Sequence, residues 1–268
     1  MTASALAVGV DVGGTVVKAG EVDLSSGALV GSAQRLATPH PAQVDAVVGT
    51  VSDALGLLQE AHADLDFGKL AVGVGLSGDV RDGDHTSGVN LDPSWIGAPA
   101  RRLLEARLQR SVRIINDADA AGIGEIRYGA GRGVSGVIVL LTFGTGIGSA
   151  VFHDGRLLPN SGFGQFPFRG ADVEVRLSAA ARERRRLTWR DWASELNDFL
   201  THVDGMLRPD LLIVGGGASE AWPEYSHYLR PSLRVVRAAL GNAAGMVGAA
   251  AYASDWAHSA PRGAGSVG

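Results

Sequence analysis

Close to its start the chain runs Ala7-Val-Gly-Val-Asp-Val-Gly-Gly-Thr-Val-Val-Lys18. The apolar run 5–10 predicts a buried strand. The two glycines after Asp11 predict a tight turn into a second strand, because such hairpin turns need the positive φ that glycine adopts. Glycines also let backbone N–H groups approach a phosphate closely, and a carboxylate at a strand end suits Mg²⁺, directly or through water. An ordinary hairpin with a polar tip is the competing interpretation.

A second segment, 137–151, repeats this plan. An apolar strand reaches Thr142, a turn follows with glycines at 144, 146 and 148, and another apolar strand leaves it. The two segments start about 130 residues apart, which is roughly the length of one domain. Two phosphate-binding hairpins at this spacing predict a duplicated fold with a cleft between its halves.

The chain between and after these hairpins alternates between strand and helix patterns. An apolar stripe predicts a helix over 42–60, and apolar runs predict strands over 70–76 and 211–214. A second long helix is expected over 189–206. This alternation is typical of a layered α/β fold.

The two glycine motifs carry a resemblance to a known family. Asp11-Val-Gly-Gly-Thr15 and Thr142-Phe-Gly-Thr-Gly-Ile-Gly148 resemble the phosphate motifs of the sugar kinase–heat shock protein–actin superfamily. Within it, the chain is most similar to the open-reading-frame, kinase and repressor (ROK) family of sugar kinases. The resemblance implies an actin-like (ribonuclease H-like) duplicated two-domain α/β fold with a cleft between the domains. It divides the chain into an N-terminal α/β domain over 1–116, a C-terminal α/β domain over 117–240, a helix over 241–257 that packs back towards the first domain, and a disordered tail over 258–268.

The resemblance also implies where the phosphoryl donor, ATP or polyphosphate, binds. Both glycine turns and a glycine pair after the strand 211–214 should hold it, with Mg²⁺ near Asp11 and charge stabilisation from Lys18. The expected donor contacts are Asp11, Gly13, Gly14, Thr15, Lys18, Thr142, Gly144, Thr145, Gly146, Gly216 and Gly217.

A third motif lies where a short strand ends at Asn116 and a helix begins at Asp117. An aspartate at such a junction is either an N-cap or a general base. Phosphoryl transfer needs positioning, charge neutralisation and one carboxylate that accepts the hydroxyl proton. The resemblance implies that Asp117 is this base and that Asn116 binds the acceptor sugar. Asp119 and Glu125, on the same helix, are expected to be solvated or to cap backbone groups.

The sugar contacts implied by the resemblance are Gly78, Asn90, Asn116, Asp117 and Gln165. Asn90 lies in the loop 87–95, where a simple turn asparagine is the alternative. One motif departs from the family pattern. Where sugar kinases of this family carry Glu-x-Gly-His, this chain has Gly162-Phe-Gly-Gln165. A lost charged partner costs about 1.5–3 kcal/mol, so the hexose is expected to bind weakly, and the true substrate is glucose, mannose or a different sugar.

The chain contains no cysteine, which excludes disulfides and thiolate metal sites. Relatives with a structural zinc carry a cysteine cluster after the loop at 159–165. Its absence here resembles the zinc-free subgroup, the polyphosphate glucokinases and polyphosphate/ATP-glucomannokinases. One dense basic run, Arg182-Glu-Arg-Arg-Arg186, is either a solvated helix end or a landing surface for a polyanion.

Charge and hydropathy exclude several function classes. The 268 residues have a net charge of −4, which does not favour nucleic-acid binding. No apolar run approaches the roughly 20 residues of a membrane span, and the N-terminus lacks the basic flank of a signal peptide. We therefore expect a cytoplasmic hexose kinase, homodimeric as such relatives usually are. A catalytically weak sugar or phosphate sensor is the alternative.

Overall fold

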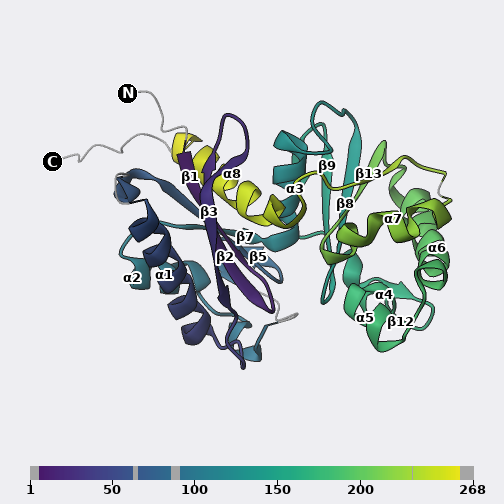
Figure 1. Cartoon of the computed structure of the whole chain (residues 1–268), viewed down its shortest axis with the longest axis horizontal. Helices are drawn as coiled ribbons and strands as arrows, with labels where there is room; N and C mark the ends of the chain where they lie inside the picture. The colour runs from purple at the N-terminus through teal and green to yellow at the C-terminus, as the bar shows by residue number, and fades with distance from the viewer. Residues whose placement is uncertain (1–5, 63–65, 86–90, 231, 260–268) are drawn as a thin grey trace.

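The computed structural model describes residues 6–62, 66–85, 91–230 and 232–259, which form two lobes side by side (Figure 1). Each lobe is built on a five-stranded sheet. In spatial order, the first sheet contains β3 (Ala28–Ala37), β2 (Val16–Asp23), β1 (Leu6–Val12), β4 (Ala71–Leu76) and β7 (Arg113–Asn116). The second contains β10 (Arg156–Leu158), β9 (Ile147–His153), β8 (Val137–Phe143), β13 (Leu211–Gly215) and β14 (Val235–Arg237).

The two sheets have the same topology. In each, three successive strands pair antiparallel, and two later strands add in parallel beside the first of the three. The duplication predicted from the two glycine hairpins is therefore confirmed within the described residues. Two short hairpins decorate the lobes: β5 (Val80–Arg81) pairs with β6 (Asp84–His85), and β11 (Pro167–Phe168) pairs with β12 (Ala171–Asp172).

Helices cover the sheets and fill the space between the lobes. They are α1 (Val44–Ala61), α2 (Ala100–Leu108), α3 (Asp117–Tyr128), α4 (Val173–Leu177), α5 (Ala179–Arg184), α6 (Trp189–Leu207), α7 (Trp222–Tyr225) and α8 (Ala244–Ser259). Among the described residues, none of these helices is both long and apolar enough to cross a membrane.

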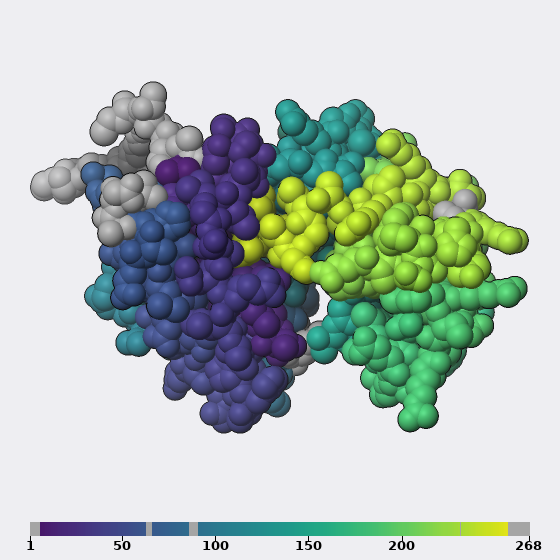
Figure 2. All heavy atoms as spheres, in the orientation of Figure 1, coloured from purple at the N-terminus to yellow at the C-terminus, as the bar shows by residue number. Residues whose placement is uncertain are grey.

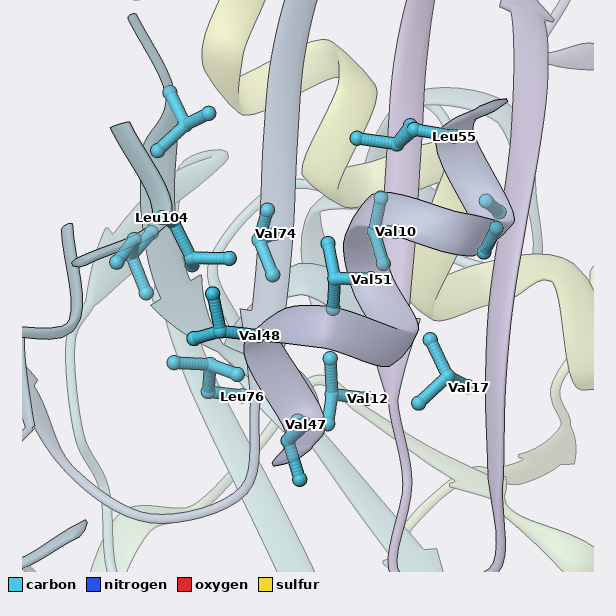
Figure 3. Packing of buried hydrophobic residues seen from close by; sticks show 14 of the residues in the cluster. Val10, Val12, Val17, Val47, Val48, Val51, Leu55, Val74, Leu76 and Leu104 are labelled. Atoms are coloured by element: carbon cyan, nitrogen blue, oxygen red, sulfur yellow. The ribbon is translucent and has the colours of Figure 1, made fainter. Parts of the chain in front are cut away.

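The apolar stripe of α1 forms the core of the first lobe. Val47, Val48 and Val51 are buried against Val10 and Val74 of the sheet (Figure 3). The stripe follows the helical period, so one face of α1 covers the sheet and the other meets solvent. In the second lobe, the buried side of α6 packs on the second sheet in the same way.

The helices α3 and α8 lie between the two sheets (Figure 1). α8 rests directly on β1 and β4. A Cβ added at Gly9 would lie 1.8 Å from the carbonyl oxygen of Met246, and one at Gly73 would lie 1.9 Å from that of Ala249. Only glycine permits this approach. The C-terminal helix thus belongs to the inner face of the N-terminal sheet.

Two details differ from the expectations. The helix predicted over 241–257 runs from Ala244 to Ser259, so residues 258 and 259 are helical, and the rest of the expected tail lies outside the described residues. In the first hairpin, neither Gly13 nor Gly14 has a positive φ. The turn closes instead through a hydrogen bond of 3.1 Å from the Gly13 N–H to the Val16 carbonyl, so close approach rather than unusual φ is the reason for glycine there.

Candidate active site

A cleft of about 270 Å³ opens between the lobes, and the space-filling view shows the hollow between the N-terminal and C-terminal halves (Figure 2). Most of the predicted site residues line it. They are Asp11, Gly13, Gly14, Lys18, Gly78, Asn116, Asp117, Thr142, Gly144, Thr145, Gly146, Gln165, Gly216 and Gly217. Thr15 is exposed and is not among the lining residues. Asn90 lies outside the described residues.

Asp117 lies in the cleft at the first position of α3. Burial raises the pKa of Asp117 to about 7, and the negative charge of Asp11 adds to this effect, followed by that of Asp119. The hydrogen bond from the Ala118 N–H, 2.8 Å, opposes it. A carboxylate with a pKa near 7 is well matched to accept a proton at neutral pH.

Asn116, and not Asp117, caps the helix. Its Oδ1 accepts the N–H of Asp119 at 2.9 Å, which satisfies one of the first N–H groups of α3. Its Nδ2 donates to the carbonyl of Gly78 at 3.0 Å and to Asp117 Oδ1 at 3.2 Å. Both N–H donors of Asn116 are thus in use, and one lone pair of Oδ1 is left for a ligand. The cap frees Asp117 for another role.

Asp11 and Lys18 form an ion pair in the cleft, with Nζ 2.9 Å from Oδ2. The two residues lie opposite each other in the β1–β2 register, so the hairpin itself sets this pair. The first turn of α8 also lies on Asp11, because a Cβ added at Gly245 would be 2.9 Å from its Cγ. The positive end of the helix dipole therefore faces the carboxylate.

Asp11 fits a magnesium ion in the way that kinase sites usually hold one. Among the described residues, no group of three or more His, Cys, Asp or Glu side chains could hold a metal. Mg²⁺ commonly needs only one or two protein carboxylates, with waters and substrate phosphates as the other ligands. Asp11 supplies one carboxylate beside the phosphate turns.

The turn between β8 and β9 lines the cleft from the second lobe. The Gly144 N–H donates to the Gly146 carbonyl at 3.0 Å, and the Gly144 carbonyl accepts the N–H of Ala180 at 3.2 Å. Gly215, before the pair Gly216-Gly217, is the register partner of Thr142. The second turn and the pair Gly216-Gly217 thus lie side by side, and both line the cleft together with Gly13 and Gly14. A Cβ added at Gly144 would meet no atom within 4 Å, so this position is open.

The loop 159–165 lines the cleft next to this turn, since a Cβ added at Gly164 would lie 2.2 Å from the Ile147 carbonyl oxygen. Gln165 lines the cleft, and a Cβ added at Gly162 would lie 3.4 Å from its Oε1. Ser161 and Phe163 anchor the loop to β9: the Ser161 Oγ donates to the Ser149 carbonyl at 3.0 Å, and the Phe163 N–H donates to the Ser149 Oγ at 3.0 Å.

Glu174, on α4, also lines the cleft, although the sequence did not point to it. Its Oε2 lies 3.4 Å from the Ile147 nitrogen and 3.4 Å from a Cβ added at Gly164. Burial raises its pKa above the ordinary value. A carboxylate thus reaches the loop that lacks the glutamate of the family motif. The only sign of Glu174 in the sequence was that an acidic residue stands in the segment after the loop 159–165, where zinc-binding relatives carry cysteines.

A second group that the sequence did not reveal joins the lobes. We call it the Asn160 clasp; it contains Val80, Asn160 and Asp119. The Asn160 side chain accepts from the Val80 N–H and donates to the Val80 carbonyl, both at 3.0 Å, and its own N–H donates to Asp119 Oδ2 at 2.8 Å. Val80 belongs to the first lobe and Asn160 to the second. Since Asn160 also lines the cleft, the clasp fixes the position of one cleft wall against the other.

Of the two alternatives expected for Asp119 and Glu125, solvation is wrong, whereas both carboxylates do accept backbone N–H groups. Asp119 is 1% exposed and Glu125 is fully buried. Burial raises the pKa of Asp119 to about 7, against the hydrogen bond from Asn160. The carboxylate of Glu125 accepts backbone N–H groups from Ala130 at 2.8 Å, Ala239 at 3.0 Å and Leu240 at 2.8 Å. It therefore ties the chain leaving α3 to the chain approaching α8.

Comparisons with known proteins agree with this arrangement. The ROK family model matches residues 7–164. The polyphosphate glucokinase of Mycobacterium leprae (strain TN) is 42% identical over 253 residues, which cover 93% of this chain and 75% of that protein.

Two solved structures are similar. The inorganic polyphosphate/ATP-glucomannokinase from Arthrobacter sp. strain KM has a TM-score of 0.92 and 42% identity, over 94% of this chain and all of that one. The ROK family glucokinase from Streptomyces griseus, in complex with glucose and AMPPNP, has a TM-score of 0.79 and 26% identity, over 93% of this chain and 99% of that one. The predicted actin-like fold and the predicted likeness to polyphosphate-dependent sugar kinases are confirmed. The chain belongs to the ROK family.

Proposed function

We propose that this chain transfers a phosphoryl group from polyphosphate or ATP to the 6-hydroxyl of a hexose. One observation carries the proposal: a carboxylate with a pKa near 7, Asp117, lies in a cleft that three glycine segments and a polar loop line together. The glycine segments suit phosphates and the loop suits sugar hydroxyls. The names of the relatives support the same reaction.

The mechanism requires little covalent chemistry from the protein. Asp117 accepts the proton of the attacking hydroxyl, and Asn116 holds the Asp117 carboxylate in place through its hydrogen bond. The turns at Gly13–Gly14 and Gly144–Gly146 bind and orient the donor phosphates through backbone N–H groups. Lys18 stabilises developing negative charge. Mg²⁺, when bound at Asp11, neutralises charge on the phosphates.

On the acceptor side, we assign hexose hydroxyls to Gln165 and Glu174. Glu174 supplies a carboxylate that the altered loop motif lacks, and Gly78 contributes backbone near Asn116. The hexose is glucose, mannose or another sugar that fits a pocket with a glutamine in place of histidine. The proposal includes no zinc, a homodimer in the cytoplasm, and a domain boundary at the start of α3.

The test of the proposal is Asp117→Asn. This variant keeps a side chain of the same shape but removes the base, so kcat with either donor should fall by about 10²–10⁴. Steady-state assays with glucose and mannose, each with ATP and with polyphosphate, measure this. Asp45→Asn, an exposed position on α1, is the matched control and should change kcat less than twofold.

A sensor that binds sugar without turning it over is the second candidate, favoured by Gly162 and Gln165. The same assays decide between them. Turnover by the wild type that is lost in Asp117→Asn supports the kinase. A wild type that binds hexose in calorimetry but turns over none of the four substrate pairs is a sensor.

A further inference from the structure

We propose that an arginine surface on α5 and the residues after it, here called the arginine track, binds inorganic polyphosphate beyond the reacting end of the chain. The track consists of Arg182, Arg184, Arg186 and Arg190. This inference rests on the proposed function and deepens it, because it assigns a second contact region for one of the two donors.

The position of α5 is the first observation. The helix begins against the second phosphate turn, since the Ala180 N–H donates to the Gly144 carbonyl at 3.2 Å. At 1.5 Å per residue, Arg184 lies only about 6 Å further along the helix axis. Figure 1 shows α4 and α5 beside the gap between the lobes. The arginines therefore begin within one side-chain length of the site where donor phosphates bind.

The local charge is the second observation. Residues 176–195 contain six arginines and three acidic residues, in a chain whose net charge is −4. The remainder of the protein is thus clearly acidic, and this segment is a positive patch on it. A patch of this kind attracts a flexible polyanion and raises its local concentration, most strongly at low ionic strength.

The pairing of the arginines is the third observation. Arg185 and Arg176 are neutralised by Glu195, at 2.6 Å and 3.4 Å. Within the part of the chain that the structure describes, no ion pair involves the four arginines of the track. Arg184, Arg186 and Arg190 are exposed. Their charge is therefore available to a ligand.

Neutral partners hold part of the track in place. The guanidinium of Arg182 lies 3.6 Å from the centre of the Trp189 ring, and Arg184 donates to the Val175 carbonyl at 2.9 Å. A ring face or a carbonyl orients a guanidinium without cancelling its charge. The remaining N–H donors form a fork that fits phosphate oxygens. Two oriented guanidinium groups without an acidic partner, Arg182 and Arg184, are better explained by an anionic ligand than by a solvated helix end.

The length of the ligand distinguishes the two donors. The three phosphates of ATP lie next to the reacting atom, so the glycine turns suffice for them. A polyphosphate chain continues past these turns with one or more charges per phosphate. The track should therefore strengthen binding of long chains and have little influence on short ones.

The experiment uses the triple variant Arg184→Gln, Arg186→Gln and Arg190→Gln, which keeps polar side chains but removes three charges. Kinetics are measured with long-chain polyphosphate, tripolyphosphate and ATP. The KM for long-chain polyphosphate should rise at least tenfold, while the KM values for ATP, tripolyphosphate and hexose change less than twofold. The salt dependence of the polyphosphate KM should also become weaker, because fewer counterions are exchanged.

The matched control is Arg102→Gln, Arg107→Gln and Arg156→Gln, three exposed arginines that do not line the cleft. An equal loss in this control, or an equal rise in the KM for ATP, overturns the track. Calorimetry with long-chain polyphosphate tests it without turnover: equal affinity of wild type and triple variant also overturns it. If the wild type uses ATP but neither uses nor binds polyphosphate, the proposal of the arginine track is wrong, and the proposed hexose kinase activity is still supported. If the wild type turns over none of the substrates, the proposed function is wrong. Calorimetry then still shows whether the arginine track binds polyphosphate.

Discussion

At the scale of single residues, the central feature is the crowding of acidic groups around Asp117. Asp11 approaches Asp117 from β1, and Asp119 lies two residues further along α3. The Lys18 ammonium is paired with Asp11. Burial and these two negative charges favour the protonated form of Asp117. The result is a base whose protonation changes near neutral pH.

This predicts the pH dependence of the reaction. A base works only when unprotonated, so kcat should rise with pH through about 7 and then level off. The measurement is kcat between pH 5.5 and 9 at saturating hexose, donor and Mg²⁺. Because terminal phosphates have a pKa of about 6, the profile is repeated with ATP and with long-chain polyphosphate, whose internal groups do not titrate there. A kcat that stays constant from pH 5.5 to 9 with both donors would contradict the raised pKa.

Sequence reasoning located the residues whose meaning lies in a local motif. Asp117 and the phosphate turns are recognisable because strand, turn and carboxylate are contiguous. Glu174 and Asn160 were missed because their roles arise from contacts with segments far away in the chain. For Asp119, the choice between solvent and a backbone contact stayed open for the same reason: nothing in the helix pattern shows that a second lobe covers it.

At the scale of elements, the Asn160 clasp joins the loop after β10 to β5 and to α3. Asn160 has φ of 56°, a conformation that asparagine tolerates better than most residues. Its side chain bonds both the N–H and the carbonyl of Val80, as the backbone of a neighbouring β-strand would. Three elements from both lobes thus share one small polar contact at the edge of the cleft.

We predict that Asn160→Gly loosens the hexose side of the cleft. Glycine keeps the backbone conformation but loses both bonds to Val80. At about 0.5–1.5 kcal/mol each, and about 2–4 °C per kcal/mol, the loss of the two bonds should lower the unfolding midpoint by about 2–12 °C. The KM for hexose should rise about threefold to tenfold, and the KM for the donor should change less than twofold.

Calorimetric melting and steady-state kinetics measure these effects. Asp154→Gly is the control for a freer backbone, since Asp154 also has positive φ, 49°, in the exposed turn between β9 and β10. Its hexose KM should stay within twofold of wild type. An Asn160→Gly protein with an unchanged midpoint and an unchanged hexose KM would show that the clasp has no part in positioning the cleft walls.

At the scale of the whole molecule, the two sheets face one cleft and each contributes one glycine turn to its lining. We predict that Gly144→Val blocks the donor without disturbing the fold. A Cβ at this position meets no atom within 4 Å, so the valine side chain would extend into the open cleft, where we propose that the donor phosphates bind. The donor KM should rise at least tenfold, while hexose affinity measured by calorimetry stays within twofold.

The control is Gly56→Val on α1, another glycine whose added Cβ meets no atom within 4 Å. It should change neither constant. Normal donor binding by Gly144→Val would mean that the second turn does not contact the donor, and the model of one donor held between both lobes would be wrong.

The duplicated architecture could be predicted because each half begins with the same sequence pattern, an apolar strand, a glycine turn and a second strand. The long amphipathic helices α1 and α6 were also predictable, since their apolar stripes are complete. The turn geometry of Gly13 and Gly14 was not, because glycine at a turn is compatible with either sign of φ. The connection that Glu125 makes between the segments after α3 and before α8 could not be predicted. A buried carboxylate that accepts backbone N–H groups leaves no pattern in the sequence.

The packing of α8 on the first sheet has a consequence during protein synthesis. β1 and β4 leave the ribosome early, but the helix that lies directly on Gly9 and Gly73 begins only at Ala244. The inner face of the N-terminal sheet therefore stays open while the whole second lobe is being translated. During that time Ala7 and Val22, which cluster with Val247 and Ala250 of α8, have no partner helix on this side. The lobe that is made first is the one that is completed last.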